Sequence, residues 1–371
     1  MLMGERRSRV LMVSQPTTAG VAQCVLDWSL GLAGSRWDVS VACPEDGWLQ
    51  AKLAQGGIPV HPWESQRSPT AGLRSESAAL RAIIAQTGPD VIFAHSSKAG
   101  LVARVVNRNQ MPLVFAPHSW SFEAVHGAIA SAALRWERFA ARWTDRFICV
   151  SDAERDLGMR SKIRGRYVVA RNGIEVDALR PVADRAGLRE ALGIGAGEVA
   201  LICVGRLSEQ KGQDVLLAAW PHVQAPDRTL TFVGDGPDEQ QLRASVDDPR
   251  VRFVGHTDRE VALQWLAAAD LVVLPSRWEG MALVPLESLA VGTPVVASDV
   301  NGAREAITDD VGALCPADDP VALASAVNAW LATPRPAART AARARVEQGF
   351  DLAQTVDTID RTLRSTVGER P

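Results

Sequence analysis

The sequence predicts an α/β protein with two domains, each built around a parallel β-sheet of its own. The chain has 371 residues, which is long for a single hydrophobic core. Short apolar runs alternate with helical patterns from end to end, which is typical of parallel strands joined by crossover helices. A stretch rich in Gly and Pro, from Glu175 to Gly197, separates two such series. We expect this stretch to act as linker and hinge.

The first series of strands defines an N-terminal domain, residues 1–180. The predicted strands are Val10–Val13, Asp38–Ala42, Asp90–Ala94, Leu113–Ala116 and Arg146–Val150. A helix is predicted over Val21–Ala33. Ser151 and Glu154 form an S-x-x-E capping box, which predicts that a second helix begins there.

The second series defines a C-terminal domain, residues 181–349. The predicted strands are Val199–Val204, Leu230–Val233, Val251–Val254, Asp270–Leu274 and Pro294–Ala297. The last segment, about residues 350–371, is predicted to hold a helix over Leu352–Leu363 that can pack back on the first domain. Because ligands of open α/β sheets bind beyond the carboxyl ends of strands, the polar residues at these ends are the candidate site.

The composition excludes several classes of protein. Hydrophobic residues make up 47% and charged residues 22%, which is ordinary for a globular protein. None of the five cysteines forms a C-x-x-C pair, so we expect no metal site and a reducing cytoplasm. The apolar run at Val10–Val13 is too short for a signal peptide, and no stretch reaches the length of a membrane span. No nucleic-acid-binding signature is present.

The charge is unevenly distributed, although the net charge is only -3. Basic side chains outnumber acidic ones over residues 1–180, and the reverse holds over residues 181–371. An anionic acceptor or membrane surface beside the first half is one interpretation. Scatter in surface charge is the other.

The segment from Glu279 to Glu287 has the most informative spacing. A strand ends at Ser276, a loop follows, and a helix is predicted to begin near Met281–Pro285, where Pro suits the first turn. The backbone amides of Met281, Ala282 and Leu283 would then form an anion site at the positive end of the helix. Glu287 could accept hydrogen bonds from ribose hydroxyls, and Glu279 lies nearer the reacting sugar. A surface loop with two incidental acids fits the same spacing.

Two cations flank the turn after the strand Val199–Val204. Arg206 and Lys211 follow Gly205 and can reach one pair of phosphates, although the spacing does not match a Walker A loop. The neighbouring Gly234-Asp235-Gly236 lacks the third glycine of a dinucleotide fingerprint, so a tight turn before a helix is favoured there.

The first half offers three further candidates at predicted strand ends. Gly20 would let a sugar or phosphate approach the backbone closely. His118 follows one strand, and His95 and Lys98 follow another. A lone histidine is more often structural, and two at strand ends of one sheet weaken that interpretation only modestly.

A basic helical pattern covers residues 128–146. The arginines Arg135, Arg138, Arg142 and Arg146 recur beside Trp136, Phe139 and Trp143. Such a helix could rest on an anionic membrane. It could equally have a core face and a solvated face.

Taken together, these motifs resemble the retaining GT-B glycosyltransferases of the group that includes phosphatidylinositol mannosyltransferase and sucrose synthase. Glu279 to Glu287 resembles the E-x7-E segment of that family. Gly205-Arg206 with Lys211-Gly212 resembles its diphosphate clamp, and Asn172-Gly173-Ile174 resembles the segment before its interdomain linker. The resemblance covers strand-end motifs along nearly the whole chain and is densest from Val199 to Ala306.

The resemblance implies two Rossmann-like domains that face a cleft, with a nucleotide-diphosphate sugar, UDP by family frequency, bound mainly by the second. Arg206 and Lys211 would stabilise the departing diphosphate without a metal. Glu287 would bind the ribose, the backbone at Val254 would meet the base, and Glu279 would contact the sugar.

In the first domain, the resemblance places His118 near the donor sugar and the acceptor, and Gly20 near the phosphate. His95 and Lys98 are candidates for the acceptor side. The acceptor would be a hydroxyl compound, which could be lipid-linked. Arg135, Arg138 and Arg142 would supply any peripheral contact with the inner face of the membrane.

The sequence departs from the family at two places. Met281-Ala282 stands where Phe-Gly is usual, and Ala19 stands where a second glycine is common. Both departures concern the sugar pocket. Two other functions on the same fold remain open: a nucleotide-sugar 2-epimerase, and a nucleotide-sugar-binding module without catalysis.

Overall fold

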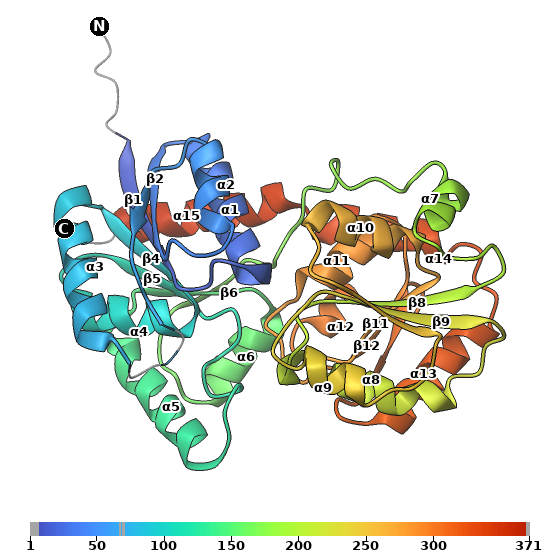
Figure 1. Cartoon of the computed structure of the whole chain (residues 1–371). Coiled ribbons are helices and arrows are strands. Elements are labelled where there is room, and N and C mark those ends of the chain that lie inside the picture. Colours follow the sequence, from blue (N-terminus) through green and yellow to red (C-terminus); the bar gives the residue numbers. More distant parts are fainter. Residues whose placement is uncertain (1–6, 67, 69–70, 369–371) are drawn as a thin grey trace, which may run out of the picture. The chain divides into compact units, whose positions relative to one another are not determined.

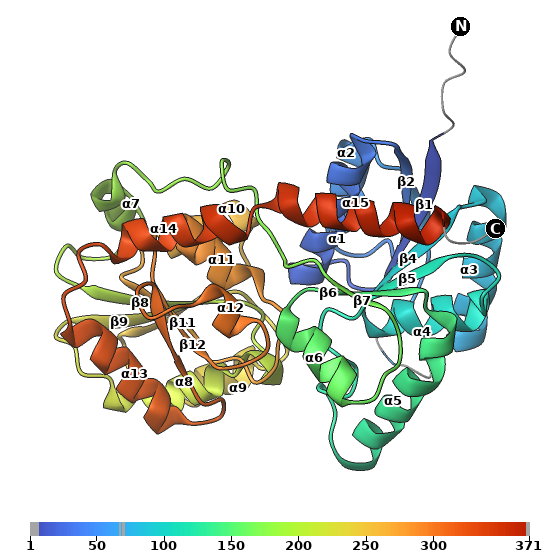
Figure 2. The ribbon, with the colours of Figure 1, turned by 180° about the vertical axis from the view of Figure 1, so that it is seen from behind.

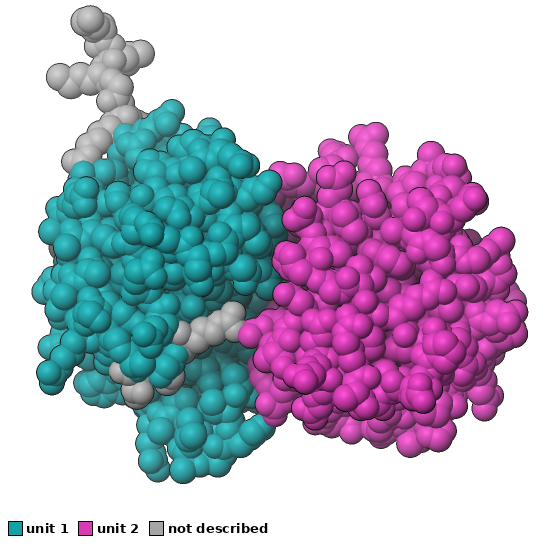
Figure 3. Space-filling view, viewed as in Figure 1, with its two compact units in different colours: residues 1–172, 353–371 teal, residues 173–352 magenta. Residues whose placement is uncertain are grey.

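A computed structural model of the chain describes residues 7–66, 68 and 71–368. The chain divides into two compact units, coloured separately in Figure 3. The first unit comprises residues 1–172 and 353–371, and the second comprises residues 173–352. Each unit is a three-layer α/β structure, with helices on both faces of one parallel sheet (Figure 1).

The first unit holds a seven-stranded sheet in the order β3-β2-β1-β4-β5-β6-β7. Every paired strand is parallel to its neighbour. The strands are β1 (Ser8–Ser14), β2 (Trp37–Cys43), β3 (Val60–Pro62), β4 (Val91–His95), β5 (Leu113–Ala116), β6 (Arg146–Cys149) and β7 (Tyr167–Val169). The strand order reverses between β1 and β4, which is where ligands of such sheets usually bind.

Seven α-helices and one short 3-10 helix cover this sheet. They are α1 (Ala19–Ala33), α2 (Leu49–Gln55), α3 (Leu73–Thr87), α4 (Ser96–Asn107), α5 (Gly127–Ala140), η1 (Ala141–Trp143), α6 (Asp152–Arg160) and α15 (Leu352–Gly368). The C-terminal helix α15 lies along α1 (Figure 2), where Gly31 leaves room for Val356. Trp37 Nε1 also donates a hydrogen bond of 2.8 Å to Asp360 on α15.

The second unit holds a six-stranded sheet in the order β10-β9-β8-β11-β12-β13, again parallel throughout. The strands are β8 (Val199–Val204), β9 (Arg228–Val233), β10 (Val251–Gly255), β11 (Leu271–Leu274), β12 (Val295–Ser298) and β13 (Gly312–Cys315). The order reverses between β8 and β11, so the switch point lies between the two strands that precede the predicted donor residues.

Helices on both faces complete the second unit. They are α7 (Arg185–Ala191), η2 (Glu209–Lys211), α8 (Gln213–Ala219), η3 (Trp220–His222), α9 (Glu239–Ala244), α10 (Arg259–Ala268), α11 (Leu283–Ala290), α12 (Ala303–Ala306), α13 (Pro320–Ala332) and α14 (Ala338–Gly349).

The strands form because their side chains are apolar on both faces, as a sheet covered on both sides requires. Val10–Val13 in β1 and Leu271–Val273 in β11 are almost completely buried. Each unit has a core of its own, with Phe115 and Trp120 central in the first and Leu230 and Phe232 in the second. These rigid sheets fix the positions of the loops at their carboxyl edges.

Every strand that the sequence predicts is present, and three more were missed. Strands β3, β7 and β13 are only three or four residues long, which leaves little apolar pattern to detect. The first unit ends at Asn172, earlier than the predicted boundary at residue 180. The linker residues therefore belong to the second unit, where Arg185 bonds to the backbone of Ala267, Ala268 and Ala269.

One predicted helix start is confirmed and one predicted helix end is wrong. Helix α11 begins at Leu283, within the predicted range Met281–Pro285, and Met281 and Ala282 lie just before it. Helix α5 ends at Ala140, and Arg146 lies in strand β6 with only 9% of its surface exposed. The helical spacing of Arg135, Arg138 and Arg142 therefore does not extend to Arg146.

Candidate functional site

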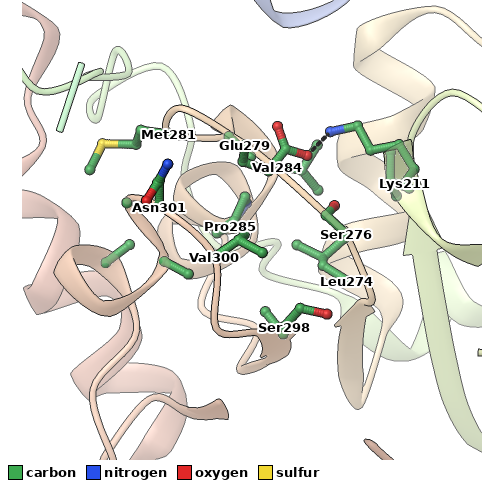
Figure 4. A pocket seen from close by; sticks show the side chains of 16 residues that line it. Lys211, Leu274, Ser276, Glu279, Met281, Val284, Pro285, Ser298, Val300 and Asn301 are labelled. Atoms are coloured by element: carbon green, nitrogen blue, oxygen red, sulfur yellow. Dashed lines mark hydrogen bonds and ion pairs between the residues drawn. The ribbon is translucent and has the colours of Figure 1, made fainter. Parts of the chain in front are cut away.

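A hollow at the carboxyl edge of the second sheet gathers four of the predicted donor residues. Lys211, Glu279, Met281 and Ala282 line it together with residues that follow β11 and β12 (Figure 4). The hollow is open to solvent on one side.

An ion pair between Lys211 and Glu279 spans the hollow. Lys211 Nζ lies 2.5 Å from Glu279 Oε1, and Figure 4 shows the two side chains reaching toward each other from different loops. Only 23% and 11% of these side chains are exposed, so the pair is poorly screened by water. The ammonium group of Lys211 is well placed to bind an anion. In this structure, its partner is the carboxylate of Glu279.

Gly212 explains how Lys211 comes so near to β11. The backbone of Gly212 has φ +65°, and a Cβ there would lie 2.1 Å from the carbonyl oxygen of Pro275. Any side chain would push the loop after β8 away from the loop after β11. Glycine at this position therefore holds the two halves of the ion pair together.

The amino end of α11 faces the same loops. Ala282 is the N-cap residue, and its side chain cannot cap the helix. The amides of Leu283 and Val284 belong to the first turn, while Pro285 has none to offer. Of the three residues whose amides were predicted to form an anion site, Leu283 is the first helical residue, Ala282 is the N-cap and Met281 precedes it.

Glu287 lies one turn further along α11 and is not among the residues that line the hollow. It is 8% exposed, and its Oε1 accepts a 2.8 Å hydrogen bond from Arg259 Nε at the start of α10. The sequence analysis missed Arg259. The only signal was a basic residue directly after Asp258, the N-cap of α10, where acidic residues are more usual.

Three predicted donor residues lie at strand ends outside the hollow. Gly205 follows β8 with φ +150°, a conformation that other residues rarely adopt. Arg206 is exposed beside it, and its carbonyl oxygen accepts a hydrogen bond from Gln213 Nε2. Val254 in β10 is 39% exposed. The structure therefore places them along one sheet edge but does not bring them into the hollow.

The loop after β12 also lines the hollow, and the sequence analysis missed it. Ser298, Val300 and Asn301 contribute to the lining. Gly302 has φ +76°, and a Cβ there would lie 2.6 Å from the carbonyl oxygen of Gly280. The Asn301-Gly302 pair is a turn signal that could have drawn attention to this loop.

In the first unit, His95 is buried and lies beside His118, which is partly exposed. His95 Nδ1 lies 3.2 Å from His118 Nε2, and the ring of Trp28 stacks 5.3 Å from the ring of His118. Burial lowers the pKa of His118 to about 3, and it lowers the pKa of His95 well below its usual value, with a further contribution from His118. Both rings are therefore neutral near pH 7.

His95 and Lys98 are both buried within the first unit. His95 is completely buried, and the ring of Phe93 lies 4.1 Å away. Lys98 is 5% exposed, and its ammonium contacts Glu76 at 2.8 Å and two backbone carbonyl oxygens. Their assignment to the acceptor side stays a prediction.

Gly20 lies in the first turn of α1, where a Cβ would meet no atom within 4 Å. The surface above it is thus open to a ligand. Its neighbour Ala19 has φ +61°, which favours glycine. The departure at Ala19 therefore places a methyl group on a backbone conformation that suits glycine better.

The basic surface of α5 is real but shorter than predicted. Arg135, Arg138 and Arg142 are exposed, and Arg142 stacks over Phe139 at 4.1 Å. Phe139 itself is 44% exposed and Ile129 is 66% exposed. Exposed cations and exposed apolar side chains thus both occur along α5 and η1.

Two kinds of feature are absent from the described residues. Over residues 7–66, 68 and 71–368, no group of three His, Cys, Asp or Glu side chains converges as metal ligands would. No helix within the described part of the chain combines the length and apolar character that a membrane crossing needs.

Comparison with known proteins gives matches to both halves of the chain. Residues 198–333 match the family model of group 1 glycosyl transferases, and residues 19–173 match that of the glycosyl transferase 4-like domain. A glycogen synthase of Mycobacterium tuberculosis is 34% identical over 287 residues, which is 73% of this chain and 67% of the relative.

Two further matches carry information about ligands in their names. An Escherichia coli UDP-Gal:alpha-D-GlcNAc-diphosphoundecaprenol alpha-1,3-galactosyltransferase is 30% identical over 57% of this chain and 58% of its own length. The crystal structure of Anabaena HepE in complex with UDP and glucose superimposes with a TM-score of 0.82. It is 25% identical and covers 96% of this chain and 100% of its own.

Proposed function

Because the chain belongs to the group 1 glycosyltransferases and has their two-domain GT-B fold, we propose that it transfers a sugar from UDP to a hydroxyl acceptor with retention of anomeric configuration. The observation that carries this proposal is the Lys211–Glu279 pair beside the amino end of α11. A cation, a carboxylate and the amino end of a helix at one sheet edge suit a diphosphate joined to a sugar.

The diphosphate is proposed to bind between Lys211 and the amides at the start of α11. Lys211 acts as a point charge, Arg206 adds a planar guanidinium from the same loop, and the helix end adds partial positive charge. These charges do the work of a metal ion, so the mechanism that we propose uses none.

The nucleoside is proposed to lie toward Glu287 and Val254. Glu287 has one oxygen bonded to Arg259, which leaves the second oxygen to accept from a ribose hydroxyl. The backbone beside Val254 would meet the base. UDP is preferred because HepE was solved with UDP and the galactosyltransferase is named for a UDP-sugar.

The proposed reaction exchanges one bond at the sugar C1 for another on the same face. The bond from C1 to the diphosphate oxygen breaks, and the acceptor hydroxyl oxygen bonds to C1. The hydroxyl proton passes to the departing phosphate oxygen. Lys211 and Arg206 stabilise the charge that develops on the diphosphate, Glu279 stabilises the positive charge on the sugar, and His118 orients the sugar or the acceptor.

Donor binding is tested by thermal denaturation with UDP, GDP, ADP and their sugars. A ligand present at a hundredfold excess over its Kd stabilises the folded state by about 2.7 kcal/mol. We expect UDP and one UDP-sugar to raise Tm and the other nucleotides to have little effect. Stabilisation by GDP alone would reject UDP as the donor nucleotide.

Transfer and configuration are tested with the best donor. We expect product only when an acceptor is present, and ¹H NMR of the product should show the anomeric configuration of the donor. Inversion would reject the proposed mechanism. A change of the sugar at C2 without acceptor would identify an epimerase, and tight UDP-sugar binding without any turnover would identify a binding module.

A lipid-linked acceptor at an anionic membrane is a second part of the proposal. Arg135, Arg138 and Arg142 project beside the exposed Phe139 on α5, which suits a helix that rests in the interface. We expect the protein to float with anionic vesicles at low salt and to leave them at high salt. Replacing Arg135, Arg138 and Arg142 together by Gln should abolish flotation. Flotation that survives this change would exclude α5 as the contact.

A further inference from the structure

The turn that carries His118 has an unusual backbone. His118 has φ +56° and Ser119 has φ +111°, and neither residue is glycine. Two successive residues in this region are strained, and such strain persists only where the surroundings over-determine it. The contacts of the next residues show what holds the turn.

Two carboxylates bind the backbone of this turn. Glu154 Oε1 accepts a 2.6 Å hydrogen bond from the amide of Ser119. Glu123 Oε2 accepts from the amide of Trp120 at 2.9 Å and from the Ser119 hydroxyl at 3.1 Å. The indole of Trp120 also donates to the carbonyl oxygen of Glu154 at 2.9 Å. Both sides of Ser119 are therefore tied to carboxylates.

Glu154 is an unusual residue to find here, because its carboxylate is completely buried. No ion pair to it is found among the residues that the structure describes. Burial raises its pKa to about 7. The negative charge of Glu123 adds to this rise, and the hydrogen bonds from the amides of Val150 and Ser119 partly offset it. Burying a carboxylate without a cation beside it costs free energy of folding. A group of this kind with a perturbed pKa is a candidate for a functional role.

The capping box of α6 shows how the chain uses this carboxylate. Ser151 Oγ accepts from the amide of Glu154 at 3.0 Å, as the S-x-x-E pattern predicts. In an ordinary box, the glutamate reaches back to the amide of the N-cap residue. Here its two oxygens reach the amides of Val150, at 2.8 Å, and of Ser119 in a distant loop. The glutamate thus joins the amino end of α6 to the turn after β5.

We propose that Glu154 is a positioning residue for His118, which it holds in place by bonding the backbone of Ser119. The proposal rests on the proposed function, because it takes the orientation of His118 to matter for transfer. Without Glu154, the turn relaxes toward negative φ and the His118 ring leaves its place against Trp28. Donor binding by the second unit does not depend on this contact.

Glu154→Ala removes both acceptors, and Glu154→Gln removes one while keeping the shape. We expect Glu154→Ala to lower kcat about 100-fold and Glu154→Gln to lower it less, because a misplaced group of this kind can cost about that factor. The Kd for UDP should stay within about twofold of the wild-type value, as the second unit holds the proposed nucleotide site.

Adding Ser119→Gly to the Glu154→Ala variant tests whether the lost kcat returns, as only the positioning role predicts. Glycine adopts φ +111° without strain, so the turn no longer needs Glu154 to enforce it. We expect Ser119→Gly to restore most of the kcat that Glu154→Ala loses. Ser151→Ala is the matched control, because it removes the cap of α6 and leaves Glu154 in place. It should lower Tm and leave kcat within about twofold of wild type.

A readout without turnover separates this proposal from the proposed function. The chain has six histidines, so selective ¹⁵N labelling gives few ring signals, and His118→Asn identifies that of His118. We expect the His118 signal to shift in both Glu154 variants and to stay in Ser151→Ala. If the signal does not move in folded Glu154→Ala, the proposal is wrong even if transfer is observed. Equal losses of kcat in Ser151→Ala and Glu154→Gln would also overturn it.

Discussion

The two candidate regions of this molecule hold their polar groups in opposite ways. In the second unit, Lys211 and Glu279 form a pair of opposite charges, and so do Arg259 and Glu287. In the first unit, His118 is a neutral ring, fixed by another ring and by hydrogen bonds on its own turn. The second unit thus presents charged side chains, whereas the first unit holds a neutral side chain in place through hydrogen bonds to the backbone of its turn.

This difference indicates a division of work. The cation of such a pair can bind an anionic group of a ligand in place of its carboxylate, and the carboxylate can bind a cationic group in place of its cation. The second unit is therefore suited to bind a charged donor. A neutral ring with a pKa of about 3 cannot take up a proton near pH 7, so the first unit is suited to orientation. The predictions below test this contrast.

The largest effect is expected from Lys211→Ala. It removes the cation of the proposed diphosphate site and leaves Glu279 without its partner. We expect kcat/KM to fall about 100- to 1000-fold, as for the loss of one main electrostatic donor. Steady-state kinetics and calorimetry with UDP measure this. The same change at Lys52, which is exposed on α2, serves as control. Unchanged UDP affinity in Lys211→Ala would reject the donor site.

Glu279→Gln should separate binding from catalysis. The variant keeps the shape of the side chain but releases Lys211 from its ion pair. We therefore expect UDP to bind more tightly, because the lysine no longer has to leave a carboxylate. Transfer should slow about 100-fold, because Glu279 no longer stabilises charge on the sugar. Weaker UDP binding together with normal kcat would contradict both roles.

The sequence predicted the second region better than the first, for a physical reason. Lys211, Glu279 and the start of α11 lie at strand ends within one sheet, so motif and topology together bring them close. The partner of Glu287 was missed, because Arg259 follows a different strand and only side-chain geometry reveals the contact. The amino end of α11 was predicted correctly, since Pro285 in the first turn marks the start of a helix.

In the first region, the capping box at Ser151 and Glu154 was predicted, but the hydrogen bond from the amide of Ser119 to Glu154 was not. Ser151 and Glu154 gave the start of α6 correctly. That Glu154 also bonds Ser119 depends on how the loop after β5 folds, and no local pattern encodes it. The complete burial of His95 could not be predicted either, because a histidine at a strand end gives the same sequence pattern whether it faces solvent or the core.

Arg259→Ala should have a smaller effect that depends on the ribose. The variant leaves Glu287 free to turn, so the carboxylate is no longer held for the hydroxyl. We expect the Kd for UDP to rise about tenfold, in the range for a hydrogen bond to a charged group. With 2′,3′-dideoxy-UDP, wild type and variant should bind alike. An equal loss with both nucleotides would show that Arg259 acts on the base or the phosphates instead.

The smallest effect concerns the pH dependence of stability. The pKa of His118 is lowered to about 3 in the folded chain, while the unfolded chain takes up this proton near pH 6.5. Between these values the unfolded state binds more protons, so stability is lost as pH falls. From pH 7.5 to 6.0, His118 alone should lower the free energy of unfolding by roughly 0.8 kcal/mol.

His118→Asn should remove this loss, and asparagine tolerates the left-handed backbone at this position. Urea titrations of both proteins at the two pH values measure the difference. Glu154, whose pKa is raised to about 7, titrates in the same range with the opposite sign, but it does so in both proteins and largely cancels. His256→Asn, at a mostly exposed histidine, is the control and should not change the slope. A His118→Asn protein as pH-sensitive as wild type would mean that His118 is protonated in the folded state, and the contrast between a charged and a neutral region would fail.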